Sequence, residues 1–268
     1  MAGKFKTIYL AKNLNDVFSQ INNIDKLQII GGATQIKELS DACLSIRSIP
    51  DLSNIEKHET YIDFGPAVTL SQMLNLEHSN LPEFLKQAIK SVAYEPIRNI
   101  ATLGGNICAK GYKHTLWAPL LALNAYLEFK SAKNTKTIPF DKFTEAPQKY
   151  VLTNIRIPLK DWDVSIFKRI GPANVISNLS ASFVFLVNTQ KDIITTFKVA
   201  YAGPFVFHSH ELENRLISKK LPLNKDFIRE IIADADRIYD SQSCTEYINP
   251  LLKAEFLNLL RNSLEQLR

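Results

Sequence analysis

The chain has 268 residues, 46% of them hydrophobic and 22% charged, enough for one large globular domain or two smaller ones. Its net charge of +5 comes from scattered basic residues, which disfavours nucleic-acid binding. The three cysteines, Cys43, Cys108 and Cys244, lie far apart, which argues against a zinc ribbon or an iron–sulfur cluster held by this chain alone. Without an apolar leader or a long apolar run, we expect a cytoplasmic chain that is neither secreted nor inserted in a membrane.

Short strands alternate with helices in the first part of the chain. In chain order the patterns predict a strand at 5–9, a helix at 13–21 capped by Asn13 or Asn15, strands at 27–30, 43–46 and 61–64, helices at 69–74 (capped by Thr69), 82–92 and 117–125, and strands at 126–129 and 151–157. The apolar spacing in 82–92 is that of an amphipathic helix.

The pattern changes near residues 158–163, where Pro158 closes a strand. Two longer strands follow at 181–187 and 196–201, and helices are predicted from 226 onward and over 251–267. We therefore expect two domains, 1–160 and 161–268, and no internal repeat or low-complexity tract.

Glycine is scarce, with 9 in the chain, roughly half of the ~7% of an average protein. Four of the nine form two pairs, Gly31-Gly32 and Gly104-Gly105, each after an apolar run that reads as a strand. Glycine admits a positive φ and close approach of another group, and successive N–H groups in such a turn can bind a phosphate. A plain turn is the alternative for either pair alone. Neither pair forms a G-x-G-x-x-G or a Walker sequence, which disfavours a Rossmann or P-loop site.

Two segments resemble the flavin motifs of the FAD-binding medium subunits of molybdenum hydroxylases, the xanthine dehydrogenase and carbon monoxide dehydrogenase type. Residues 29–36 (IIGGATQI) resemble the first motif, and 96–107 (PIRNIATLGGNI) match the second closely. The likeness continues through APLLALNA (118–125), LTNIRIP (152–158), FKR (167–169), YAGP (201–204) and the terminal helix, and so covers nearly the whole chain.

The resemblance implies an α+β fold. A vanillyl-alcohol-oxidase-type FAD-binding domain of two α/β subdomains would be followed by a small C-terminal domain of antiparallel sheet and helices. It also implies the residues around FAD, in three groups. The first wraps the diphosphate and ribityl: Ile29, Ile30, Gly31, Gly32, Ala33, Thr34, Gln35 and Ile36. The second closes on the same region: Thr102, Gly104, Gly105 and Asn106. The third comprises Thr115, the apolar neighbour Leu152, and Lys168 beside the isoalloxazine carbonyl.

The sequence departs from the family pattern at two places. His114-Thr115 stand where members often carry a Ser-Asp pair that hydrogen-bonds the flavin chain, and Ala33 stands where many carry Gly or Asn. The loop Lys110–Lys113 is also unusually basic. These departures motivate an alternative, a subunit of the same fold that has weakened or lost FAD binding and serves in assembly. A stand-alone flavin oxidoreductase is a further alternative.

By resemblance, the chain is the flavin subunit of an oxidoreductase that is active in a heteromeric complex. A 2Fe-2S small subunit would supply electrons, a molybdopterin-binding large subunit would oxidise the substrate, and NAD or another acceptor would take electrons from FAD. We predict no catalytic or metal-binding residue in this chain. His208 and His210 lack a recognisable third ligand and are interpreted as surface residues, and His114 as a solvated loop residue. Core packing is the default for Tyr94 and Trp117, which flank the second motif.

Overall fold

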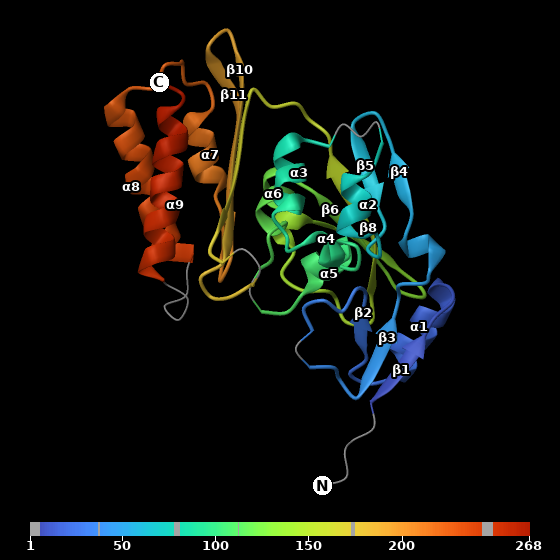
Figure 1. Cartoon of the computed structure of the whole chain (residues 1–268). Coiled ribbons are helices and arrows are strands. Elements are labelled where there is room, and N and C mark those ends of the chain that lie inside the picture. The colour runs from blue at the N-terminus through green and yellow to red at the C-terminus, as the bar shows by residue number, and fades with distance from the viewer. Residues whose placement is uncertain (1–5, 37, 78–80, 112, 173–174, 243–248) are drawn as a thin grey trace. The chain divides into compact units, whose positions relative to one another are not determined.

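The computed structural model describes residues 6–36, 38–77, 81–111, 113–172, 175–242 and 249–268 (Figure 1). The chain forms two compact units. The first comprises residues 1–80, 93–109 and 123–159, and the second comprises 81–92, 110–122 and 160–268. The last boundary between the two units lies between Leu159 and Lys160. Two short segments of the N-terminal half, residues 81–92 and 110–122, nevertheless belong to the second unit. The division of the chain into two continuous domains, 1–160 and 161–268, therefore stays a prediction.

The first unit contains a small parallel sheet in the order β1-β3-β2. Its strands are β1 (Thr7–Leu10), β2 (Gln28–Ile30) and β3 (Ala42–Ser45), and helix α1 (Leu14–Asn23) connects β1 to β2. Asn13 caps α1 by accepting a hydrogen bond from the Asp16 N–H, as its position before the apolar stripe predicts. Val17 of α1 and Leu44 of β3 are fully buried in the core beneath this sheet.

A second sheet of the first unit is antiparallel, with the order β4-β5-β8-β6-β7. Its strands are β4 (Ile55–Lys57), β5 (Tyr61–Phe64), β6 (Tyr126–Lys130), β7 (Thr135–Pro139) and β8 (Val151–Pro158). The unit also contains the short helices α2 (Leu70–Leu74), α4 (Glu95–Arg98) and α5 (Leu103–Cys108) and the 3-10 turns Pro50–Leu52 and Phe140–Lys142. Thr69 and Gln72 form the predicted N-terminal cap of α2 as a reciprocal capping box.

The second unit is built on an antiparallel sheet in the order β12-β11-β10-β9. Its strands are β9 (Val164–Ile170), β10 (Ala181–Gln190), β11 (Ile193–Ala202) and β12 (Val206–His208). Alternate side chains of β10 and β11 pack against helices α7 (His210–Leu216), α8 (Lys225–Gln242) and α9 (Pro250–Glu265). Helices α3 (Glu83–Lys90) and α6 (Trp117–Ala122) pack on the same sheet, and Figure 1 shows them across it from α7–α9. This explains why seven consecutive residues of β10 are buried.

The predicted α+β class and the C-terminal unit of antiparallel sheet with helices are both confirmed. One prediction about local structure is wrong. The apolar run before Gly104 is not a strand, because residues 97–100 complete the turn of α4 and the Ile97 carbonyl accepts hydrogen bonds from the N–H groups of Ile100 and Ala101. The second glycine pair lies inside helix α5 instead of in a turn after a strand.

Candidate functional site

The first glycine pair lies where the chain leaves the parallel sheet. Strand β2 pairs with β3 in the register Gln28–Cys43 to Ile30–Ser45, and its last carbonyl, that of Ile30, accepts a hydrogen bond from the Ile46 N–H. Gly31 and Gly32 follow immediately, at the carboxyl ends of two parallel strands. This is the edge of a parallel sheet at which α/β proteins bind ligands.

The structure brings the two glycine segments together. A Cβ atom on Gly31 would lie 2.6 Å from Oγ1 of Thr102, and one on Gly32 would lie 2.0 Å from the backbone carbonyl oxygen of Ile100. These segments are far apart in the sequence, yet no side chain fits between them at Gly32. The expectation that both loops face one region is therefore met in geometry, while the role of each residue stays a prediction.

Backbone donors of the first glycine loop have no acceptor within the described protein. The N–H groups of Gly31, Gly32, Ala33 and Thr34 donate no hydrogen bond to any residue that the structure describes. Gly31, Gly32 and Thr34 are half-buried and Ala33 is exposed, so this loop lies near the surface of its unit. Successive backbone N–H groups without an acceptor in the protein are the kind of donor that anion-binding loops use.

Ala33 takes the unusual backbone conformation in this loop. Its φ is +55°, in the left-handed region that costs a residue with a Cβ roughly 1–2 kcal/mol. The Gly or Asn that the family resemblance implies at this position would fit that conformation, because both residues adopt it readily. Neither glycine of the pair has a positive φ. The glycines give close approach, and Ala33 makes the turn.

The second glycine segment uses its backbone donors internally. Thr102 caps α5, with its hydroxyl oxygen accepting from the Gly105 N–H at 3.1 Å. The Leu103 and Gly104 N–H groups donate to the carbonyls of Val68 and Pro66, both at 2.9 Å, and the Asn106 N–H donates to the Thr102 carbonyl. The hypothesis that this pair also offers a row of free N–H groups is therefore wrong.

Gly105 differs from the other three paired glycines in what surrounds it. A Cβ on Gly105 would meet only Thr102 Oγ1, at 3.0 Å, and Gly105 is exposed. Gly104, by contrast, is buried, and a Cβ there would lie 2.6 and 2.8 Å from atoms of Pro66. Packing thus requires glycine at position 104, whereas at 105 the bare backbone leaves open space.

Exposed apolar side chains lie in the helix and turn that precede α5. Tyr94, Ile97 and Ile100 are 65%, 39% and 37% exposed. The expectation of core packing is wrong for Tyr94, whereas Trp117 is buried as expected. A cluster of exposed apolar residues within ten positions of the glycine pair is a surface on which an aromatic ring of a ligand can lie. The motif resemblance did not single out Ile97 or Ile100 as contacts.

The remaining predicted cofactor residues fall in both units. Leu152 lies in β8 of the first unit, opposite Phe129, and is buried, whereas Gln35 is exposed and Ile36 half-buried in the loop after Thr34. Thr115 and Lys168 belong to the second unit, where Thr115 is buried just before α6. Lys168 is exposed on the edge strand β9, opposite Phe183 of β10.

His114 is buried, which contradicts its interpretation as a solvated residue. Burial, together with the neighbouring Lys113 ammonium, lowers the pKa of His114 to about 4. The imidazole is therefore neutral at physiological pH, and it adds no charge beside Thr115. Lys113 lies with its Nζ 4.0 Å from the ring centroid of Trp117.

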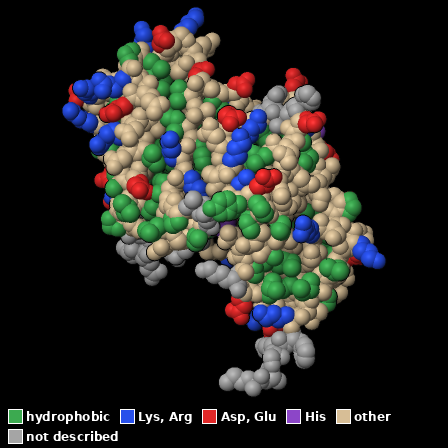
Figure 2. Space-filling view, in the orientation of Figure 1, with side chains coloured by type: hydrophobic (Ala, Val, Ile, Leu, Met, Phe, Trp, Pro, Cys, Tyr) green, Lys and Arg blue, Asp and Glu red, His purple; other side chains and the backbone are tan. Residues whose placement is uncertain are grey.

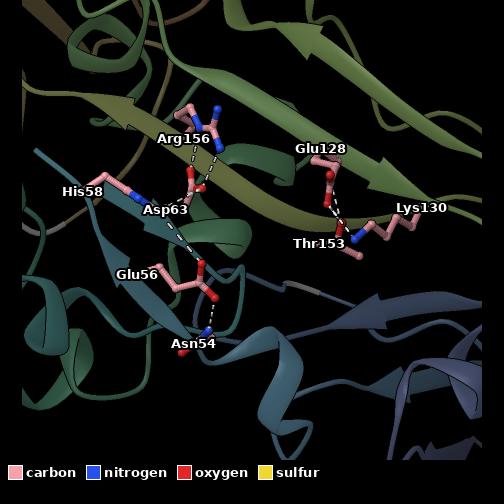
Figure 3. A network of polar contacts seen from close by, with 8 residues as sticks. All are labelled: Asn54, Glu56, His58, Asp63, Glu128, Lys130, Thr153 and Arg156. Carbon is pink, nitrogen blue, oxygen red and sulfur yellow. Dashed lines mark hydrogen bonds and ion pairs between the residues drawn. The ribbon is translucent and has the colours of Figure 1, made fainter. Parts of the chain in front are cut away.

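A second polar cluster of the first unit lies on the antiparallel sheet and was not predicted (Figure 3). Arg156 of β8 donates from Nε and Nη2 to the two carboxylate oxygens of Asp63 on β5, at 2.9 and 2.8 Å. Burial raises the pKa of Asp63, but the hydrogen bonds from Arg156 outweigh it and the net pKa is lowered. The pair joins neighbouring strands in register, which accounts for it as a structural link.

With this geometry in place, the family of the chain follows from comparison with known proteins. Residues 3–160 match the family model described as the FAD binding domain in molybdopterin dehydrogenase. The chain therefore belongs to this family of FAD-binding subunits and domains of molybdenum hydroxylases.

Individual relatives agree with this assignment. The chain is 30% identical over 171 residues to the nicotine 6-hydroxylase medium subunit of Paenarthrobacter nicotinovorans, covering 60% of this chain and 58% of that protein. It is 25% identical over 255 residues to abscisic-aldehyde oxidase of Arabidopsis thaliana, covering 81% of this chain and only 19% of that much longer protein. The fold is similar to a chain of the crystal structure of Cu,Mo-CO dehydrogenase, with a TM-score of 0.79 at 15% identity over 100% of this chain and 97% of the other.

None of the described helices is both long and apolar enough to cross a membrane.

Proposed function

We propose that this chain binds FAD at the first glycine loop and α5 and serves as the electron-transferring flavin subunit of a molybdenum hydroxylase complex. The observation that carries the proposal is the row of four N–H donors at 31–34, unused by the described residues, in a loop whose Gly31 lies close to Thr102 and whose Gly32 lies close to Ile100. A diphosphate needs several converging donors, and backbone N–H groups provide them without adding charge.

Each part of the first unit has its own task in this proposal. The N–H groups of Gly31–Thr34 would hydrogen-bond the diphosphate oxygens, and the open space at Gly105 would leave room for the cofactor. The exposed side chains of Ile97 and Ile100 present apolar surface to a ring of the cofactor. Thr102 fixes the start of α5 through its cap and so holds the two segments in register.

The roles of the other predicted residues rest on the family resemblance. Leu152 would border the flavin as a buried apolar contact, Thr115 would supply a neutral hydroxyl to the cofactor chain, and Lys168 would lie near the isoalloxazine carbonyl. The family's carboxylate next to the flavin chain is absent here, because Thr115 occupies that position and His114 is neutral. We therefore propose that the backbone donors of the first loop contribute most of the affinity.

When bound, FAD exchanges electrons singly with iron–sulfur centres and in pairs with acceptors such as NAD. The protein binds and orients it and tunes its electronics. The proposed partners are a 2Fe-2S small subunit and a molybdopterin-binding large subunit. Support comes from the medium-subunit relatives and from the absence of any clustered cysteines in this sequence.

The first experiment measures flavin binding by the purified full-length chain. The chain is freed of bound cofactor, titrated with FAD, and followed by flavin fluorescence and visible absorption. We expect saturable binding with micromolar or tighter affinity, and retention of the flavin spectrum after gel filtration. A folded chain that neither carries nor takes up flavin would overturn the proposal and favour the assembly subunit.

A second experiment tests the place in a complex. The chain is co-expressed with a candidate large subunit and a candidate small subunit, sought among the reading frames next to its gene, and a tag on the chain is used for purification. We expect the three proteins to co-purify with flavin, iron and molybdenum, and NADH-dependent dye reduction by the chain alone to be absent. Full oxidoreductase activity of the isolated chain would instead support a stand-alone flavin enzyme.

A further inference from the structure

The first unit contains a cavity whose lining residues are not among those assigned to FAD. Its volume is about 440 Å³, within the roughly 300–1,000 Å³ of small-molecule sites. The wall comes from the segment after β3, the residue Ser53 before β4, the start and end of helix α2, and the end of α4. All of the lining residues belong to the first unit, so the cavity lies within one compact body.

The wall of this cavity is polar and carries one cation. Arg47 is the only charged residue among those that line it, and none of them is acidic. Hydroxyl and carboxamide side chains make up most of the rest: Ser53, Thr69, Ser71, Gln72, Asn75 and Asn99. One positive charge among many neutral hydrogen-bonding groups suits an anion that also carries hydroxyl groups or a polar ring.

Most of these polar side chains are available to a ligand. Four of them make no hydrogen bond or ion pair with the part of the chain that the structure describes: Arg47, Ser71, Asn75 and Asn99. Thr69 and Gln72, by contrast, bond each other's segment in the capping box of α2. Arg47 and Asn99 are also exposed, so a ligand can reach them from solvent. A guanidinium without an acidic neighbour is free to bind a phosphate through parallel N–H groups.

The cavity lies next to the first glycine loop. The residue before Arg47, Ile46, donates its N–H to the last carbonyl of β2 at 3.1 Å. The residue after Asn99, Ile100, has its carbonyl oxygen against Gly32. The chain thus passes directly from the walls of the proposed diphosphate loop to the two exposed polar side chains of the cavity.

Adenosine 5′-phosphate carries the groups that this wall complements. A guanidinium matches the phosphate, a carboxamide pairs with the edge of adenine through one donor and one acceptor, and hydroxyl groups pair with ribose hydroxyls. We propose that the cavity binds an adenosine 5′-phosphate moiety, with Arg47 on the phosphate and Asn75 and Asn99 on the nucleoside. Arg47 and Asn99 are then specificity-determining residues that the sequence motifs do not single out.

This moiety is available from two sources. One is the adenosine half of FAD, an assignment that rests on the proposed function. The cavity would then let the chain select FAD over FMN, which lacks that half. The other source is a free adenine nucleotide, for which the cavity would be a separate site beside the flavin loop.

The test titrates AMP into the flavin-free full-length chain by isothermal titration calorimetry, which needs no flavin signal. We expect one saturable site. Arg47→Gln should weaken AMP binding by more than about tenfold, and Asn99→Ala by about fivefold. Both side chains are exposed and unpaired among the described residues, so neither change should disturb the fold, which circular dichroism checks. The matched control is Arg261→Gln, which removes an exposed charge on α9 and should leave AMP affinity unchanged.

Repeating the titration with saturating FAD or FMN distinguishes the two sources. Loss of AMP binding with FAD but not with FMN assigns the cavity to the adenosine half of FAD, and binding that persists with FAD assigns it to a free nucleotide. Either of two results would overturn the inference even where FAD binds: no AMP binding to the folded wild-type chain below about 1 mM, or an affinity unchanged in both variants. AMP binding by a chain that takes up no FAD would overturn the proposed function alone.

Discussion

The two glycine pairs look alike in the sequence and behave differently in the structure. Gly31-Gly32 follow a strand of the parallel sheet, and the N–H groups of the loop they open remain unused by the described residues. Gly104-Gly105 lie in the first turn of α5, where every N–H has an acceptor in the protein. The two similar motifs thus have different proposed roles. The first segment supplies the N–H donors for the cofactor, and the second packs against that loop and supports it.

The first glycine loop packs closely against the segment that precedes α5. We expect a methyl group added at Gly32 to disrupt this packing more than any other change proposed below. Gly32→Ala places a Cβ 2.0 Å from the Ile100 carbonyl oxygen, a backbone atom that cannot rotate away. We expect a loss of about 3 kcal/mol in the free energy of unfolding and loss of FAD binding. Urea unfolding followed by circular dichroism measures the first. A variant as stable as wild type would show that the two segments do not pack this closely.

Gly104→Ala tests the packing of the second glycine segment against Pro66, on the buried side of α5. The new Cβ would lie 2.6 Å from Pro66 Cβ and 2.8 Å from the Pro66 carbonyl, and the rigid proline ring gives little room. A gain in helix propensity of about 1 kcal/mol offsets part of the clash. We expect a net destabilisation of about 2 kcal/mol, measured as a lower urea midpoint with an unchanged slope. An unchanged midpoint would contradict this packing.

Ala33→Gly tests the left-handed backbone conformation of the first glycine loop. The positive φ of Ala33 is strained, so glycine removes that strain but adds conformational entropy to the unfolded chain. We expect a net gain of about 0.5–1 kcal/mol in unfolding free energy and equal or tighter FAD binding. Ala33→Val is the opposing control, since a β-branched residue tolerates a positive φ poorly and should destabilise the loop. A destabilising glycine would refute the left-handed conformation.

Gly105→Ala separates stability from binding and should have the smallest effect on the fold. Its Cβ would meet only the hydroxyl of Thr102, at 3.0 Å, in an exposed helical position. We expect the unfolding free energy to change by less than about 1 kcal/mol. FAD affinity should nevertheless fall by more than about tenfold, because the methyl group would occupy the cofactor's space, and fluorescence titration measures it. Unchanged affinity would remove Gly105 from the proposed site.

Charge alone does not reveal the proposed flavin site (Figure 2). Lysine, arginine, aspartate and glutamate side chains are interspersed over the face in view, without a single basic stripe. The proposed donors are backbone N–H groups, which carry no formal charge and cannot be recognised from the amino-acid composition. A mild net charge of +5 is therefore compatible with a ligand that carries a diphosphate.

Elements with a local cause could be predicted from the order of the residues. Asn13 and Thr69 cap their helices because each offers a side-chain oxygen just before an apolar stripe. The long apolar runs of β10 and β11 predicted the C-terminal strands, and the second motif identified the family that the comparison then showed. Local pattern suffices for the two caps because each hydrogen bond joins residues three positions apart. It suffices for the strands because each apolar run lies within one continuous segment.

Features that depend on contacts between distant segments required the folded chain. Which glycine pair lacks N–H acceptors among the described residues depends on Pro66 and Val68, more than thirty residues before α5. That Ala33 and not a glycine makes the left-handed turn could not be read from a motif that contains both. His208 looked solvated until β12, β11 and α7 enclosed it with Glu213 and Lys198. Hydrogen bonding and burial are set by the assembled neighbours, and those neighbours are brought together only when the chain folds.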